Sequence, residues 1–246
     1  MTKILGHRGA SGYAPENTLE AFALAAEQGA DGVELDVHLS ADGEMVVIHD
    51  ETVDRTTDGT GLVCKMTLAE LKALNARNGM GKEEDVFRIP TLKEVYEVLK
   101  PTPLMINVEI KTDQMLYDGI CEKLVALAQE MGMEDRIIYS SFNHNTILEM
   151  KALNPEAKTG LLYVEALGRP WEYAKLLGAN ALHPGKLAPL TYPDELRLAT
   201  ENGIDTNIWT VNAPEEMEFL IRRGASSIIT NYPALALTVR EKVSSF

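Results

Sequence analysis

Two apolar segments of the sequence carry charged residues at a spacing that suits a metal ion. Glu34 and Asp36 are two residues apart in one segment, and Glu109 and Lys111 are two residues apart in the other. On a β-strand, side chains two residues apart point to the same face. Three carboxylates in one small pocket would repel each other unless a cation lay among them. Oxygen-only ligands are typical of Mg²⁺ or Ca²⁺, so we expect Glu34, Asp36 and Glu109 to bind one of these divalent cations.

Two histidines and two cationic side chains lie at the ends of apolar segments as well. His7 and Arg8 end the first segment of the chain, and His49 ends a short segment further on. The forked guanidinium of Arg8 and the point charge of Lys111 suit an anion such as a phosphate. Two histidines can act as general base and general acid near neutral pH. Together with a divalent cation, these groups indicate phosphoryl chemistry.

A simpler interpretation is that these charged residues face solvent, as a lone Glu-x-Asp on a strand usually does. The neighbouring residues argue against it, because Val33, Leu35 and Val37 alternate with the acids, and the flanking sequence indicates that both faces of this strand are buried. Buried acids without partners cost folding free energy, so a functional role explains them more simply.

The apolar pattern predicts strands that alternate with helices. Strands are expected at 4–7, 32–39, 104–110, 136–141, 159–163, 181–183, 206–211 and 227–230, with a hairpin partner at 44–48. Helices are expected from about residue 19 to Gly29 and near 92–100, 115–131, 144–153, 170–177, 193–202, 214–223 and 233–243. Eight such units favour an α/β fold of the (β/α)₈ TIM-barrel type. A doubly wound sheet would predict a glycine-rich phosphate-binding motif, and the sequence has none.

We expect residues 1–246 to form a single TIM-barrel domain. Residues 50–89 follow the second strand, and they are polar and too long for an ordinary loop, so we interpret them as a small insertion at the mouth of the barrel. In a TIM barrel, residues at the carboxyl ends of the strands face a common site. The fold therefore predicts that the acids, cations and histidines converge there.

Charge and composition limit the binding partners and the cellular location that we expect for this protein. The 246 residues include 37 acids against 23 bases, which gives a net charge of −14 and argues against nucleic acid or an anionic membrane as a partner. The apolar runs are far too short to span a bilayer, and the first residues lack the apolar core of a signal peptide. Cys64 and Cys121 match neither a disulfide framework nor a zinc site. We therefore expect a cytoplasmic protein without membrane insertion.

Several motifs resemble those of the glycerophosphodiester phosphodiesterase family, in the same order over essentially the whole chain. The matching segments are His7-Arg8-Gly9-Ala10, Pro15-Glu16-Asn17-Thr18, Val33-Glu34-Leu35-Asp36-Val37, Asp42-Gly43, Val46-Val47-Ile48-His49-Asp50, Thr52–Gly59, Ile89-Pro90-Thr91-Leu92, Asn107-Val108-Glu109-Ile110-Lys111, Trp209-Thr210-Val211-Asn212 and Ile229-Thr230-Asn231-Tyr232-Pro233. The resemblance implies a TIM barrel with an insertion after the second strand. It also implies hydrolysis of glycerophosphodiesters to sn-glycerol 3-phosphate and an alcohol, dependent on a divalent cation.

The resemblance also implies roles for individual residues. By position, the metal ligands would be Glu34, Asp36 and Glu109, and the phosphate would be bound by Arg8 and Lys111. His7 and His49 would be the acid–base pair, and we assign His7 as the base and His49 as the acid. Either water or a glycerol hydroxyl could attack the phosphorus first.

Other residues would support or line the pocket. Glu16 would orient Arg8, while Asn17 would either support the site or only cap the following helix. Phe142 and Trp209 end the fourth and seventh strands, where they would form a pocket wall or fill the barrel core. The family often has an acid in place of Asn231, which we expect to cap a turn.

The expected substrates are water-soluble glycerophosphodiesters such as glycerophosphocholine or glycerophosphoethanolamine. One alternative is a phosphodiesterase of the same superfamily that resembles a lysophospholipase D, although the polar, acidic segment 50–89 gives little sign of an apolar channel. The other is a non-catalytic scaffold, since a fold does not fix a function. The presence of both histidines beside all three acids counts against a scaffold. A homo-oligomer is compatible with the sequence.

Overall fold

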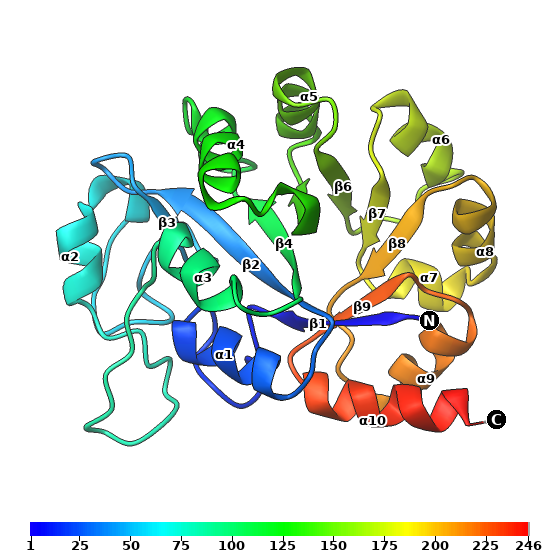
Figure 1. Cartoon of the computed structure of the whole chain (residues 1–246), viewed down its shortest axis with the longest axis horizontal. Coiled ribbons are helices and arrows are strands. Elements are labelled where there is room, and N and C mark those ends of the chain that lie inside the picture. The colour runs from blue at the N-terminus through cyan, green and yellow to red at the C-terminus, as the bar shows by residue number, and fades with distance from the viewer. Residues whose placement is uncertain (246) are drawn as a thin grey trace.

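A closed barrel of parallel strands forms the centre of the molecule in the computed structural model, which describes residues 1–245 (Figure 1). Within these residues, eight parallel strands follow one another around the barrel: β1 (Lys3–His7), β2 (Gly32–Leu39), β4 (Met105–Ile110), β5 (Ile137–Ser141), β6 (Lys158–Tyr163), β7 (Ala181–Pro184), β8 (Asp205–Ile208) and β9 (Ser227–Thr230). β1 pairs with both β2 and β9, which closes the sheet. The TIM-barrel prediction is therefore confirmed.

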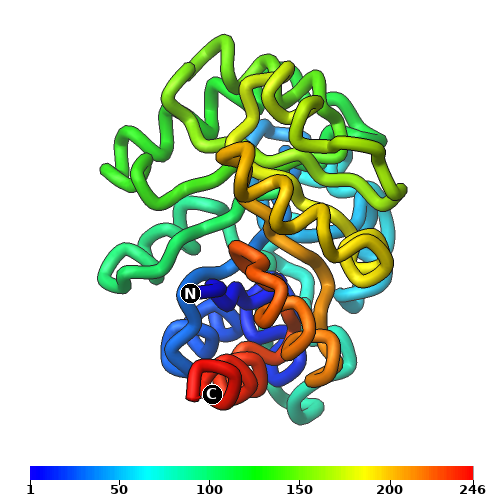
Figure 2. Tube along the Cα trace, turned by 90° about the vertical axis from the view of Figure 1, so that its right-hand side faces the viewer, coloured from blue at the N-terminus to red at the C-terminus, as the bar shows by residue number. Residues whose placement is uncertain are grey.

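Helices surround this barrel, as the side view in Figure 2 shows. One follows each barrel strand: α1 (Leu19–Glu27), α3 (Leu92–Leu99), α4 (Ile120–Met131), α5 (His144–Leu153), α6 (Pro170–Leu176), α8 (Asp194–Glu201), α9 (Pro214–Arg222) and α10 (Pro233–Ser244). α10 lies beside β1, where the Arg240 guanidinium donates a hydrogen bond to the Thr2 carbonyl at 3.1 Å. No helix among the described residues has both the length and the apolar character needed to cross a bilayer.

The structure differs from the predicted elements at a few boundaries. α4 begins at Ile120 rather than near 115, because Gly119 adopts a left-handed conformation (φ +74°) that a continuous helix does not allow. β8 ends at Ile208 rather than at 211, although Trp209 still forms an isolated bridge with Gly185. The short helix α7 (Leu187–Thr191) was not predicted, since five residues are too few to show a helical period.

Strand β2 explains how the sequence directs its acids into the barrel. All eight residues of β2 are buried. Val33, Leu35 and Val37 pack with apolar residues of α1 and α3, so they face the surrounding helices. Because side chains alternate along a strand, the intervening Glu34 and Asp36 point into the barrel.

The barrel interior is polar and hydrogen-bonded below the level of these acids. Ser227 Oγ donates to Asn207 Oδ1 at 2.6 Å, and Asn207 Nδ2 donates to His183 Nε2 at 2.9 Å. A side chain on Gly160 would meet the His183 ring at 2.2 Å, so the missing side chain makes room for the imidazole. His183 is fully buried within this network and does not reach the surface.

The chain leaves the barrel between β2 and α3. β3 (Met45–Val47) pairs antiparallel with β2, and η1 (Val63–Lys65) and the short helix α2 (Leu68–Ala73) follow. This segment has a small apolar cluster of its own, made by Val46, Ile48, Val53, Val63, Leu71, Ala76 and Ile89. It is joined to the first barrel loop by polar contacts with Glu16.

Candidate active site

Three neighbouring strands bring the predicted site residues together. β1 pairs with β2 so that His7 lies opposite Glu34, and β2 pairs with β4 so that Asp36 lies opposite Glu109. His7 and Glu109 lie at or next to the carboxyl ends of β1 and β4, and the register brings Glu34 and Asp36 of the longer strand β2 to the same level. The register therefore places a histidine and three acids at one end of the barrel, where TIM-barrel sites form.

The three acids form a tight and buried cluster. Glu34, Asp36 and Glu109 are 3%, 0% and 8% exposed, and each offers a carboxylate oxygen that lies within 4.8 Å of the other two. Asp36 Oδ1 is buried without any hydrogen-bond partner among the described residues. A buried carboxylate oxygen normally needs a partner, and a hard divalent cation would supply one.

The electrostatics of this cluster fit the same interpretation. Burial, followed by the charges of Asp36 and Glu109, raises the pKa of Glu34 well above its usual value. Burial and the charge of Asp36 also raise the pKa of Glu109, although Lys111 opposes this. Burial would raise the pKa of Asp36 too, but Arg8 and other nearby cations hold it below its usual range. The protein alone therefore does not favour three ionised carboxylates, and a bound cation would.

Lys111 contacts one of these acids directly. It is 5% exposed, and Lys111 Nζ donates a hydrogen bond to Glu109 Oε1 at 2.7 Å. The same ammonium lies 3.5 Å from His49 Nε2. Burial would lower the pKa of Lys111, but Glu109 and Asp36 raise it above its usual value, so the side chain carries its positive charge into the site.

Arg8 lies between two acids at the end of β1. Its guanidinium donates to Glu16 Oε1 at 2.7 Å, and its Nε lies 3.4 Å from Asp36 Oδ2. Its backbone N–H donates to Glu34 Oε2 at 2.9 Å. Arg8 adopts a left-handed conformation (φ +54°), which is uncommon for a residue with a side chain and typical of functional sites.

His7 has one ring nitrogen engaged and the other directed at the acids. Its Nδ1 lies 2.7 Å from Asn231 Oδ1, and its Nε2 lies 3.9 Å from Glu34 Oε2. Because the Asn231 oxygen can only accept, Nδ1 carries the proton and Nε2 is free to take one. Burial, with a further contribution from Arg8, lowers the pKa of His7 to about 4, so the ring is neutral at pH 7.

The expectation that the Asn231 side chain caps a turn is wrong. Its side chain binds His7, and Asn212 caps this turn instead, because Asn212 Oδ1 accepts from the backbone N–H of Asn231 at 3.0 Å. The two partners in the His7 contact are 224 residues apart, and barrel closure between β1 and β9 brings them together.

His49 lies on the opposite side of the acids from His7, and its ring is held in the same way, with Nδ1 against a side-chain oxygen. Its Nδ1 lies 2.6 Å from Asp50 Oδ1, while its Nε2 faces Lys111. The carboxylate accepts the Nδ1 proton, which orients the ring. His38 is buried behind it, and His38 Nε2 donates to the backbone carbonyl of His49 at 3.0 Å.

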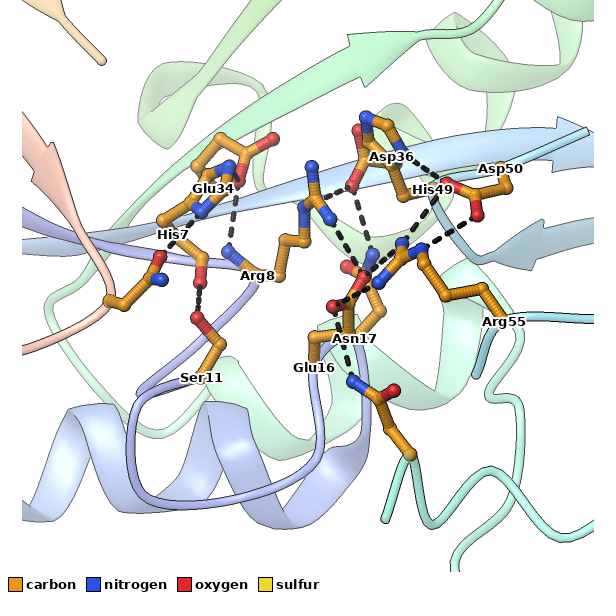
Figure 3. A network of polar contacts seen from close by, with 12 residues as sticks. His7, Arg8, Ser11, Glu16, Asn17, Glu34, Asp36, His49, Asp50 and Arg55 are labelled. Atoms are coloured by element: carbon orange, nitrogen blue, oxygen red, sulfur yellow. Dashed lines mark hydrogen bonds and ion pairs between the residues drawn. The ribbon is translucent and has the colours of Figure 1, made fainter. Parts of the chain in front are cut away.

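Glu16 and Asn17 both contact the site (Figure 3). Glu16 accepts from Arg8 and also from Arg55, with both guanidinium nitrogens of Arg55 at 2.8 Å. Asn17 Nδ2 donates to Asp36 Oδ2 at 2.9 Å, and Thr18 rather than Asn17 caps helix α1. The alternative that Asn17 is only a helix cap is therefore wrong.

Two aromatic residues directly follow strands β5 and β8. Phe142 and Trp209 meet edge to face, with ring centroids 5.5 Å apart. The Trp209 indole N–H donates to the His183 carbonyl at 2.8 Å, which fixes the ring. Both rings are partly exposed and are not part of the buried apolar core.

Comparison with known proteins places the chain in a family. Residues 7–235 match the model of the "Glycerophosphoryl diester phosphodiesterase family". The chain belongs to this family. A "Glycerophosphodiester phosphodiesterase" of Caldanaerobacter subterraneus subsp. tengcongensis is 44% identical over 241 residues, which is 98% of each chain. A family member with the same description from Bacillus altitudinis is 37% identical over 99% of this chain and 100% of its own.

A solved structure agrees with this family assignment. The phosphodiesterase of Oleispira antarctica, in complex with the product sn-glycerol-3-phosphate, is 32% identical and superposes with a TM-score of 0.84. The match covers 98% of this chain and 97% of that structure. The family's barrel thus extends over nearly the whole chain.

Proposed function

We propose that this chain hydrolyses glycerophosphodiesters, such as glycerophosphocholine or glycerophosphoethanolamine, to sn-glycerol 3-phosphate and an alcohol. Membership of the family and the names of its relatives support this activity. The observation that carries the proposal is the placement of His7 and His49 on either side of the acidic cluster, each with Nδ1 bound to an oxygen and Nε2 directed inward.

Glu34, Asp36 and Glu109 are the proposed ligands of a divalent cation, either Mg²⁺ or Ca²⁺. The buried Oδ1 of Asp36, which has no hydrogen-bond partner in the described part of the chain, supports this, as do the raised pKa values of Glu34 and Glu109. When bound, such a cation acts as a Lewis acid on the phosphoryl oxygens. Arg8 and Lys111 are the proposed phosphate-binding side chains, because both bring a positive charge to the same end of the barrel.

The two histidines would move the protons of the reaction. His7 is neutral at pH 7, so its Nε2 can accept the proton of an attacking water or of an attacking glycerol hydroxyl as the new P–O bond forms. Attack by the glycerol hydroxyl would give a cyclic phosphate, which a water would then open to sn-glycerol 3-phosphate. His49, with Nδ1–H held by Asp50 and a second proton on Nε2, would donate the Nε2 proton to the alcohol oxygen as the old P–O bond breaks. Phe142 and Trp209 would line the pocket, and Glu16 and Asn17 would hold Arg8 and Asp36 in place.

We also propose that residues 1–246 form one domain, with 50–89 as an insertion at the barrel mouth. The contacts of Arg55 and Asn78 with Glu16 in the first barrel loop support this placement. A cytoplasmic location is proposed from the two unpaired cysteines, Cys64 and Cys121. The net charge of −14 supports a small-molecule substrate rather than nucleic acid, and a homo-oligomer is compatible with this function.

Turnover of glycerophosphocholine, followed by release of sn-glycerol 3-phosphate, tests the activity. We expect turnover with Mg²⁺ or Ca²⁺ and none after chelation. His49→Ala should lower kcat by about 100-fold or more, as for loss of a general acid, with little change in the unfolding temperature. His144→Gln is the matched control, since among the described residues the His144 ring hydrogen-bonds only with the Leu162 carbonyl and the Tyr173 hydroxyl. Wild-type protein that turns over no glycerophosphodiester with either metal would favour the scaffold alternative.

A further inference from the structure

Arg55 lies outside the barrel strands, yet its side chain contacts two acids, Asp50 and Glu16, that each bind a residue of the candidate active site (Figure 3). Its Nε and one terminal nitrogen donate to the two oxygens of Asp50, at 2.7 and 3.0 Å. Its two terminal nitrogens donate to the two oxygens of Glu16, both at 2.8 Å. One planar guanidinium therefore binds two carboxylates, each through a pair of hydrogen bonds.

Each of these carboxylates holds a residue of the proposed machinery. Asp50 accepts from His49 Nδ1 at 2.6 Å, and Glu16 accepts from the Arg8 guanidinium at 2.7 Å. A continuous chain of contacts thus runs from His49 to Arg8 by way of Arg55. It joins the proton donor to the phosphate-binding residue across 41 positions of sequence.

The positive charge between these acids matters as much as the hydrogen bonds. Oε1 of Glu16 and Oδ1 of Asp50 accept from the same nitrogen of Arg55, so the two carboxylates lie close together. Without a cation between them they would repel each other and move apart. The pKa of Asp50 is lowered to about 2, mainly by its hydrogen bonds with Arg55, so Asp50 faces His49 as an ionised carboxylate.

We propose that Arg55 is a positioning residue, which holds His49 in its proton-donating orientation through Asp50 and Arg8 in its phosphate-binding orientation through Glu16. This inference rests on the proposed function. Lysine cannot replace Arg55 here, because one ammonium cannot form four hydrogen bonds in a planar fork. Residues 50–89 would then contribute to catalysis from outside the barrel.

The test compares Arg55→Gln and Arg55→Lys with Arg77→Gln as a matched control. Arg77 lies in the same segment, and within residues 1–245 its side chain hydrogen-bonds only to the Lys82 carbonyl. Two substrates share the glycerol phosphate and differ in the leaving alcohol, which is choline in one and 4-nitrophenol in the other. Choline needs a proton from the general acid as it leaves, whereas 4-nitrophenolate does not.

For both Arg55 variants we expect kcat on the choline ester to fall about 10- to 100-fold, as for loss of an orienting contact behind a functional group. The fall on the 4-nitrophenyl ester should be several-fold smaller, and KM should rise for both substrates. Asp50→Asn should reproduce the loss of kcat that depends on the leaving group, and Glu16→Gln should reproduce the rise in KM. Arg77→Gln should match the wild type.

Two further measurements separate positioning from a general loss of structure. Nitrogen NMR of the histidine rings, at a pH where the rings are neutral, should show the Nδ1–H tautomer of His49 in the wild type, which leaves Nε2 as the nitrogen that takes up and donates the catalytic proton, and a mixture of the two tautomers in Arg55→Gln. Unfolding temperatures within a few degrees of the Arg77→Gln control would show that the variants are folded, and Arg55→Lys provides a second folded variant. Equal losses on both esters, or an unchanged His49 signal, would overturn the inference. A wild type that hydrolyses neither ester would instead refute the proposed function.

Discussion

Replacing Asn231 by aspartate tests whether His7 acts as a neutral base. In the structure Asn231 Oδ1 lies 2.7 Å from His7 Nδ1, and burial and Arg8 lower the pKa of His7 to about 4. A carboxylate in the same place would stabilise the imidazolium form. Such a neighbour shifts a pKa by about 1–3 units, so the pKa of His7 should rise to about 6.

The kinetic consequence follows from the fraction of neutral His7. With a pKa of about 4, roughly nine-tenths of His7 is neutral at pH 5, and with a pKa of about 6 roughly one-tenth is. We therefore expect kcat/KM of Asn231→Asp to be about 10-fold below that of the wild type at pH 5, and within about twofold at pH 8.

The assay is kcat/KM for glycerophosphocholine between pH 4.5 and 8.5 with saturating divalent cation. Asn231→Ser keeps a neutral acceptor without the charge and serves as the control. Proton NMR of His7 in the metal-free protein gives its pKa directly. If the acid limb of the variant coincides with that of the wild type while the pKa of His7 rises, His7 is not the base.

Three other substitutions test separate parts of the molecule. Burial lowers the pKa of His183 to about 3, so the folded state does not bind a proton that the unfolded chain binds below about pH 6.5. The free energy of unfolding therefore falls as the pH falls, and this histidine alone lowers it by about 2 kcal/mol between pH 7 and pH 5. Urea unfolding of His183→Gln should show a pH-dependent loss smaller by that amount, and an equal loss in both proteins would contradict the assignment. Lys111→Met removes the partner of buried Glu109, so the metal-free variant should lose about 3 kcal/mol of unfolding free energy, and added Mg²⁺ should restore part of it. An unchanged unfolding free energy would show that the ion pair does not stabilise the fold. Phe142→Ala removes the ring that packs on Trp209, so KM for glycerophosphocholine should rise several-fold with the unfolding temperature nearly unchanged, and an unaltered KM would place Phe142 outside the pocket.

The sequence predicts those parts of the site that depend on local periodicity. The alternation of Val33, Leu35 and Val37 with the acids of β2 identifies a strand buried on both faces, and the structure confirms it. The order of strands and helices then places the carboxyl ends of β1, β2 and β4 together. These predictions need only a period of two residues and the rule that sequential parallel strands lie side by side.

The remaining contacts depend on distant parts of the chain. Asn231 binds His7 only because β9 closes the barrel against β1, and no local pattern indicates that pairing. Arg55 reaches Glu16 from a segment whose path is set by its own small apolar cluster. For Asn17 the sequence permits two roles, because asparagine is both a good helix cap and a good hydrogen-bond donor, and only the position of Asp36 decides between them.

Calorimetric titration of the metal-free protein with Mg²⁺ and with Ca²⁺ tests the central claim, that the three acids hold a divalent cation. We expect one ion per chain for at least one of these metals, and an affinity at least 10-fold weaker in Glu34→Gln. Glu20→Gln changes an exposed acid on α1 and should bind the metal as the wild type does. Wild-type protein that binds neither ion, or Glu34→Gln that binds as tightly as Glu20→Gln, would contradict the account.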